Sequence, residues 1–138
     1  MMLVVYVATL APGVTFWDAG EFIAAAHSLG IPHPPGTPLF VLLLNVWARL
    51  FSTVLPYAVA TNLFSAACTA AAAGTAAWLL ASRRGLGMAA VAGAVCAGAM
   101  STVWLNATET EVYAASLLLA MLTLAAAERS AREDGYRW

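Results

Sequence analysis

Long runs of apolar residues, separated by short polar turns, limit what this sequence can fold into. A helix that crosses the ~30 Å hydrocarbon core of a membrane needs about 20 apolar residues. Only 9% of the residues are charged and 62% are hydrophobic, whereas soluble domains carry about 25% charged residues. This composition excludes a water-soluble globule and a disordered tail, so we predict an all-α, polytopic integral membrane protein. The apolar runs cover residues 3–16, 39–55, 57–81, 86–105 and 112–127.

The positions of the arginines indicate which apolar run does not cross the membrane. The run at 39–55 is short for a span and contains Arg49. If this run crossed, with the N-terminus in the cytoplasm, the other five arginines would lie outside, against the positive-inside tendency. If the run instead dips into the membrane without crossing, or lies along the outer surface, those five arginines lie inside. They are Arg83, Arg84, Arg129, Arg132 and Arg137.

We therefore predict a single transmembrane domain over residues 1–138 with four crossing helices. The crossing helices are expected near residues 3–16, 57–81, 86–105 and 112–128. Residues 17–56 would form an outer loop with juxtamembrane helices, and 129–138 a cytoplasmic tail. The net charge of -1 gives no reason to expect nucleic acid as a partner.

Small residues recur four apart in the run at 86–105. Such faces let helix backbones approach closely in lipid, so they predict helix contacts within the chain or with a partner subunit. A generic alanine-rich helix is the alternative. The two faces are Ala89, Gly93 and Ala97, and Ala90, Ala94 and Gly98. Cys68 and Cys96 lie in apolar runs without metal-ligand spacing, and we expect them to be packing or lipid-facing residues.

Two carboxylates stand at the start of the predicted outer loop. Asp18 and Glu21 are three residues apart and share one helical face. Carboxylates beside a bilayer are costly and usually functional. Thr15 and Asp18 also have the spacing of a capping box, so a purely capping role for Asp18 is the alternative.

Further polar residues are candidates for the same chemistry. Four prolines and two glycines between residues 30 and 38 predict a stiff turn that presents His33. His33 is either a ligand or proton carrier, or a turn residue only, and we expect His27 to be structural. Glu109 and Glu111 precede the last apolar run, where they are either functional or simply favourable near the positive end of a helix.

Three segments, 11–22, 33–40 and 109–113, carry a resemblance in this order along the chain. They resemble the N-terminal module of a bacterial membrane family that is similar to transmembrane protein O-mannosyltransferases and belongs to the GT-C glycosyltransferases. The resemblance implies an inverting enzyme that moves a sugar from a polyprenyl-phosphate-type lipid carrier to an acceptor hydroxyl. It also implies a bacterial inner membrane, cytoplasmic or intracytoplasmic, with the acidic loops on the periplasmic side.

The resemblance assigns roles to the polar residues. Asp18 matches the carboxylate expected to act as general base. Glu21, Glu109 and Glu111 would position the acceptor, bind a divalent cation or support Asp18. His33 and Arg49 would face the donor phosphate. A cation is optional in this superfamily, so no metal ligand is assigned.

The length of the chain leads to two alternative functions. Members of the resembled family are several times longer, so we expect a non-catalytic accessory subunit packed in a larger bacterial membrane complex, such as a respiratory or photosynthetic assembly. The alternative is a fragment of the glycosyltransferase. Membrane lipids and other membrane-protein subunits are the expected partners. If the chain is part of an enzyme, a lipid-linked sugar is a further expected partner.

Overall fold

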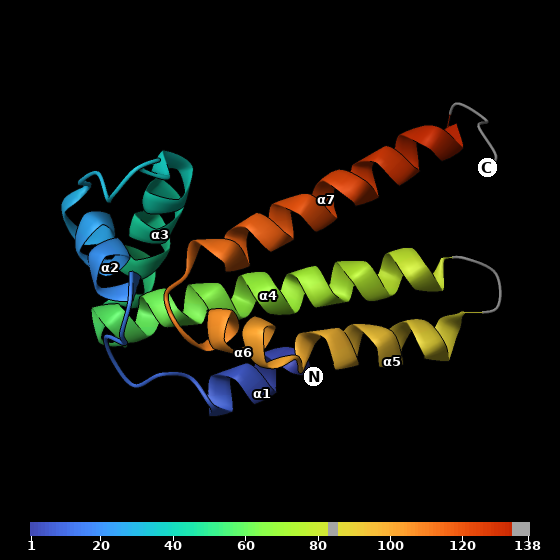
Figure 1. Cartoon of the computed structure of the whole chain (residues 1–138), viewed down its shortest axis with the longest axis horizontal. Helices are drawn as coiled ribbons and strands as arrows, with labels where there is room; N and C mark the ends of the chain where they lie inside the picture. The colour runs from blue at the N-terminus through green and yellow to red at the C-terminus, as the bar shows by residue number, and fades with distance from the viewer. Residues whose placement is uncertain (83–85, 134–138) are drawn as a thin grey trace.

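The computed structural model describes residues 1–82 and 86–133, which form seven α-helices and no strand (Figure 1). For these residues the all-α prediction is confirmed. The helices are α1 (Met2–Ala8), α2 (Ala19–Ser28), α3 (Pro38–Phe51), α4 (Tyr57–Ala81), α5 (Gly87–Gly98), α6 (Ser101–Thr108) and α7 (Val112–Glu133).

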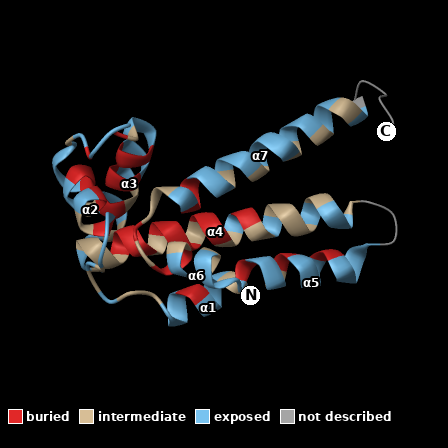
Figure 2. Ribbon diagram, viewed as in Figure 1, coloured by how far each residue is buried: buried red, intermediate tan, exposed pale blue. Residues whose placement is uncertain are grey.

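Helix α4 is the centre of the structure and contacts α1, α3, α5, α6 and α7. Its 25 residues rise about 38 Å at 1.5 Å each, which is enough to cross a membrane core. The first half of α4 is largely buried, whereas most of α7 is exposed (Figure 2). By length and composition, α4 and α7 are the two single helices able to span a membrane among the described residues.

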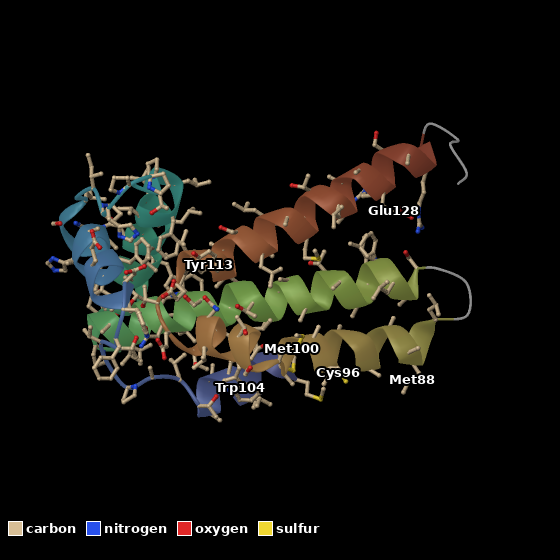
Figure 3. All side chains as sticks on the ribbon, in the orientation of Figure 1. Met88, Cys96, Met100, Trp104, Tyr113 and Glu128 are labelled. Carbon is tan, nitrogen blue, oxygen red and sulfur yellow. The ribbon has the colours of Figure 1, made fainter. Side chains whose placement is uncertain are left out.

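The predicted helix at 86–105 is broken into α5 and α6. The two helices are bent by 69° and together qualify as one broken span or a re-entrant loop. The break lies at Ala99 and Met100, where Met100 is extended, and Figure 3 shows Met100 at this junction. The Tyr6 hydroxyl donates a 2.7 Å hydrogen bond to the Gly98 carbonyl, which satisfies an acceptor at the end of α5.

The first predicted helix is also shorter than expected, because α1 ends at Ala8 rather than at residue 16. Pro12 and Gly13 interrupt a helical hydrogen-bond pattern, and the Ala11 and Gly13 carbonyls accept hydrogen bonds from α4 instead. The described residues thus contain two helices able to span a membrane, or three if the bent pair is one span. The prediction of four crossing helices is not confirmed.

Helices α2 and α3 lie within the predicted outer loop and pack at one end of α4 (Figure 1). Helix α3 has 14 residues and is shorter than the candidate spans. Two side chains hold it in place: Asn45 Nδ2 donates to the Ala26 carbonyl at 2.6 Å, and Trp47 Nε1 donates to the Ala60 carbonyl at 3.0 Å. These bonds fix α2 and α3 against each other and against α4.

The small-residue faces of α5 differ in burial. Ala90, Ala94 and Gly98 are buried, whereas Ala89, Gly93 and Ala97 are exposed. Of the two cysteines, Cys68 is buried and Cys96 is exposed.

The last turns of α4 and α7 are joined at the end of the molecule remote from α2. Arg132 Nη2 donates to Ser82 Oγ at 2.9 Å and forms a 3.0 Å ion pair with Glu128. Arg83, Arg84 and Arg137, which the topology prediction used, lie outside the described residues.

Candidate functional site

The start of α2 presents both predicted carboxylates to solvent. Asp18 occupies the N-cap position, but its side chain makes no capping hydrogen bond. Glu21 lies in the first turn of the helix, and both side chains are about half exposed. The capping alternative for Asp18 therefore lacks the hydrogen bond that defines it. Before Asp18, Trp17 has a φ of 62° and its side chain is exposed.

The proline-rich turn brings His33 to these carboxylates. Glu21 accepts two hydrogen bonds from this residue, at 2.6 Å from the backbone N–H and at 2.8 Å from Nδ1. His33 Nε2 lies 3.9 Å from Asp18 Oδ2. The Gly36 N–H closes the turn by donating to the His33 carbonyl at 2.9 Å. The ring of Phe22, which is buried and packs edge-on against Phe40, lies 5.7 Å from the imidazole.

These contacts favour the charged forms of both partners. The hydrogen bonds from His33 lower the pKa of Glu21, although the residue is exposed. The hydrogen bond to Glu21, aided by the negative charges of Glu21 and Asp18, raises the pKa of His33. The contacts therefore favour the cationic form of the imidazole beside the two carboxylates.

The same three residues have the geometry of a small cation site. Asp18, Glu21 and His33 each offer one ligand atom, and these atoms lie within 4.8 Å of one another. Two carboxylate oxygens and one nitrogen of a neutral imidazole suit a divalent cation, so cation binding would take the place of the protonated His33. When bound, such an ion would supply positive charge toward a phosphate group.

The second acidic pair lies between α6 and α7. Glu109 is the C-cap of α6, and Glu111 directly precedes α7. Partial burial raises the pKa of Glu111, and the negative charges of Asp18 and Glu109 raise it further. The fold thus places Glu111 within electrostatic reach of Asp18. Arg49, in contrast, lies in the last turn of α3, at the end of that helix remote from His33.

Sequence reasoning missed a buried polar network at the base of this site. The network joins the first turns of α4 to the segment before α2 and to the connection between α6 and α7. Asn62 Nδ2 donates to the carbonyls of Ala11 and Gly13, at 3.0 and 2.9 Å. The Thr110 hydroxyl donates to Asn62 Oδ1 at 2.6 Å and lies 2.9 Å from Thr61 Oγ1. The available signal was a cluster of polar residues, at positions 61, 62 and 65, within an apolar run.

Comparisons with known proteins identify relatives of the chain. The mouse (Mus musculus) protein O-mannosyl-transferase TMEM260 is 49% identical over 47 residues, which are 34% of this chain and 7% of that protein. The Dictyostelium discoideum protein O-mannosyl-transferase tmem260 is 43% identical over 53 residues, 38% of this chain and 6% of that protein. No solved structure matches the chain. The family model of the protein O-mannosyl-transferase TMEM260 N-terminal domain matches residues 18–138. The chain therefore belongs to the TMEM260 N-terminal domain family.

Proposed function

We propose that this chain contributes the catalytic carboxylate of a membrane glycosyltransferase, with Asp18 as the general base. The observation that supports this role is the placement of the Asp18 carboxylate, exposed and without a capping hydrogen bond, beside the Glu21–His33 pair. The two relatives are named as O-mannosyl-transferases. We therefore propose mannose as the transferred sugar and a hydroxyl group as the acceptor.

In the proposed reaction, the Asp18 carboxylate takes the proton of the acceptor hydroxyl. The hydroxyl oxygen forms a bond to the anomeric carbon, and the bond from that carbon to the phosphate oxygen of the lipid carrier breaks. Attack opposite the leaving phosphate inverts the configuration. The cationic form of His33 provides charge for the phosphate, and Glu21 keeps the imidazole charged and oriented.

Glu111 has a different proposed role. Its raised pKa makes the neutral carboxyl group more available than at an exposed glutamate, so this side chain can donate a hydrogen bond to the acceptor as well as accept one. We place Glu109 at the edge of the same acceptor site. Arg49 is left out of the proposed donor site because it lies at the remote end of α3.

The orientation in the membrane follows from the positions of the charges. We propose that the end carrying α2, α3 and the acidic residues faces the outside, which in a bacterial host is the periplasm. The opposite end, with Arg129 and Arg132 in the last turns of α7, would face the cytoplasm.

The accessory-subunit function expected from length alone gains no support from the comparisons, because both relatives are named as transferases. The aligned segments cover 7% and 6% of these relatives, so we assign the proposed activity to the complete protein that carries this domain. Positioning of carrier, sugar and acceptor supplies much of the rate of such a reaction.

Substitution of Asp18 tests the proposal. The complete protein, in membranes, is assayed for transfer from a polyprenyl-phosphate-linked mannose to a hydroxyl acceptor. We expect Asp18→Asn to lower kcat by about 10²- to 10⁴-fold, the usual contribution of a general base. Ser28→Ala, an exposed substitution on the same helix, is the matched control and should keep the wild-type rate. An Asp18→Asn protein with the rate of this control would refute Asp18 as the base.

A further inference from the structure

The side chain of Asn62 is fully buried on α4 and has partners in two separate loops. Both of its N–H groups donate to the segment before α2, at the carbonyls of Ala11 and Gly13. Its carbonyl oxygen accepts the hydroxyl hydrogen of Thr110, in the connection between α6 and α7. All of the donor capacity of this amide is therefore used.

Two more hydrogen bonds tie the same segments together. The Ala11 N–H donates to the Thr108 carbonyl at 3.0 Å, which joins the first loop to the last residue of α6, where the second loop begins. The Glu111 N–H donates to Ser65 Oγ, one turn along α4 from Asn62, at 3.2 Å. Each loop is thus bonded to α4 and to the other loop.

The bonded segments lead directly to the acidic residues of the proposed site. Gly13 is five residues before Asp18, and Thr110 lies between Glu109 and Glu111. Because hydrogen bonds join these segments to each other and to Asn62, the carboxylates of Asp18 and Glu111 are carried by connected loops. The negative charge of Asp18 is also one of the causes of the raised pKa of Glu111.

Simple helix packing does not require such a network. Apolar side chains fill the space between helices without the cost of desolvating an amide and several hydroxyl groups. A satisfied polar network in a low-dielectric interior instead favours one particular arrangement of the groups it joins. Here it favours the close approach of two segments: the loop before α2, which leads to Asp18, and the α6–α7 connection, which carries Glu111.

We propose that Asn62 and Thr110 are positioning residues, which hold the Asp18 loop against the Glu111 loop so that both carboxylates address one acceptor hydroxyl. This inference rests on the proposed function for its catalytic consequence. The coupling of the two loops does not depend on that function and can be measured separately.

The experiment compares Thr110→Val, which removes the hydroxyl but keeps the shape, with Thr110→Ser, which keeps the hydroxyl. In the complete protein, Thr110→Val should lower kcat on the order of 10- to 100-fold, because small misplacements of catalytic groups have effects of this size. The KM for the lipid-linked sugar should stay within about twofold, because His33, the proposed partner of its phosphate, is held by Glu21 and not by Thr110. Thr110→Ser should restore most of the rate. Thr75→Val, at a half-buried threonine of α4 that is bonded only to its own helix, is the matched control.

Hydrogen–deuterium exchange gives a readout that needs no activity. Thr110→Val should speed amide exchange in residues 11–17, nearly 100 residues away in the sequence, whereas Thr110→Ser and Thr75→Val should not. Ser65→Ala is a milder second variant, because it removes only the 3.2 Å acceptor of the Glu111 N–H. If Thr110→Val does not fold, Ser65→Ala should still lower kcat.

The possible results separate the two hypotheses. Unchanged exchange in residues 11–17, or equal loss of kcat in the Val and Ser variants, overturns the positioning role. If wild-type protein transfers no sugar while Thr110→Val still opens residues 11–17, the proposed function fails and the coupling of the loops stands.

Discussion

Replacement of Gly98 by alanine should destabilise the protein, because α1 packs into the break between α5 and α6. A Cβ atom at this position would lie 2.9 Å from the Tyr6 hydroxyl and 3.0 Å from Met2 Cε. The methionine side chain can move. Tyr6 cannot move freely, because it is fully buried, packs edge-on against Trp104 at 5.5 Å and donates its hydrogen bond to the Gly98 carbonyl.

The expected loss of stability combines three effects. Overpacking in a filled region costs about 1–3 kcal/mol, and a lost hydrogen bond costs about 0.5–1.5 kcal/mol. The lower backbone entropy of alanine in the unfolded chain returns about 0.5–1 kcal/mol. We therefore expect Gly98→Ala to lower the free energy of unfolding by about 1–3 kcal/mol.

Gly93 provides a matched control in the same helix, because a Cβ atom there would meet nothing within 4 Å. Gly93→Ala should raise the free energy of unfolding by about 0.5–1 kcal/mol. The assay is unfolding by SDS in mixed micelles, followed by tryptophan fluorescence. In a Tyr6→Phe background, which removes the hydroxyl, the cost of Gly98→Ala should fall, as a double-mutant cycle can show. If Gly98→Ala is as stable as Gly93→Ala, the docking of α1 in this break is refuted.

Three further predictions concern the acidic end of the molecule and its orientation. The His33 imidazole should titrate above its ordinary pKa of 6.5, and Glu21→Gln should bring that pKa back toward 6.5 in an NMR titration; an unchanged midpoint would contradict the pairing. Because the pKa of His33 is raised on folding, the stabilisation by this pair is lost as pH rises through the folded pKa of His33. Because the pKa of Glu21 is lowered, the stabilisation is also lost as pH falls through the folded pKa of Glu21. The pair therefore stabilises the fold fully between about pH 4.5 and pH 6.5, the ordinary pKa values of the two groups. For the orientation, single cysteines at Phe16 and Ser130 in a cysteine-free protein should differ in labelling of intact cells by an impermeant maleimide. Label at position 16 and none at position 130 is expected, and the reverse pattern would overturn the proposed orientation.

Much of the candidate site could be read from the sequence because its residues are close together in the chain. Asp18 and Glu21 share a helical face by spacing alone, and prolines on both sides of His33 predicted a stiff turn. The hydrogen bond between His33 and Glu21 could not be predicted, because its 12-residue separation depends on how α2 and α3 pack. The electrostatic contact between Glu111 and Asp18 was even harder to predict, because all of α2 to α6 lie between these residues in the chain.

The sequence by itself predicted helices that are apolar and long enough for a membrane, because in lipid the backbone polar groups must be satisfied within the protein. It also identified the acidic residues, because charge is conspicuous in such a chain. Only the tertiary structure decided where the helices end. Asn62 donates hydrogen bonds to the Ala11 and Gly13 carbonyls, and Tyr6 donates one to the Gly98 carbonyl. These contacts join segments that are distant in the chain. Local apolar periodicity carries no record of such contacts, so it could predict continuous helices at 3–16 and 86–105 where the fold has a short helix and a break.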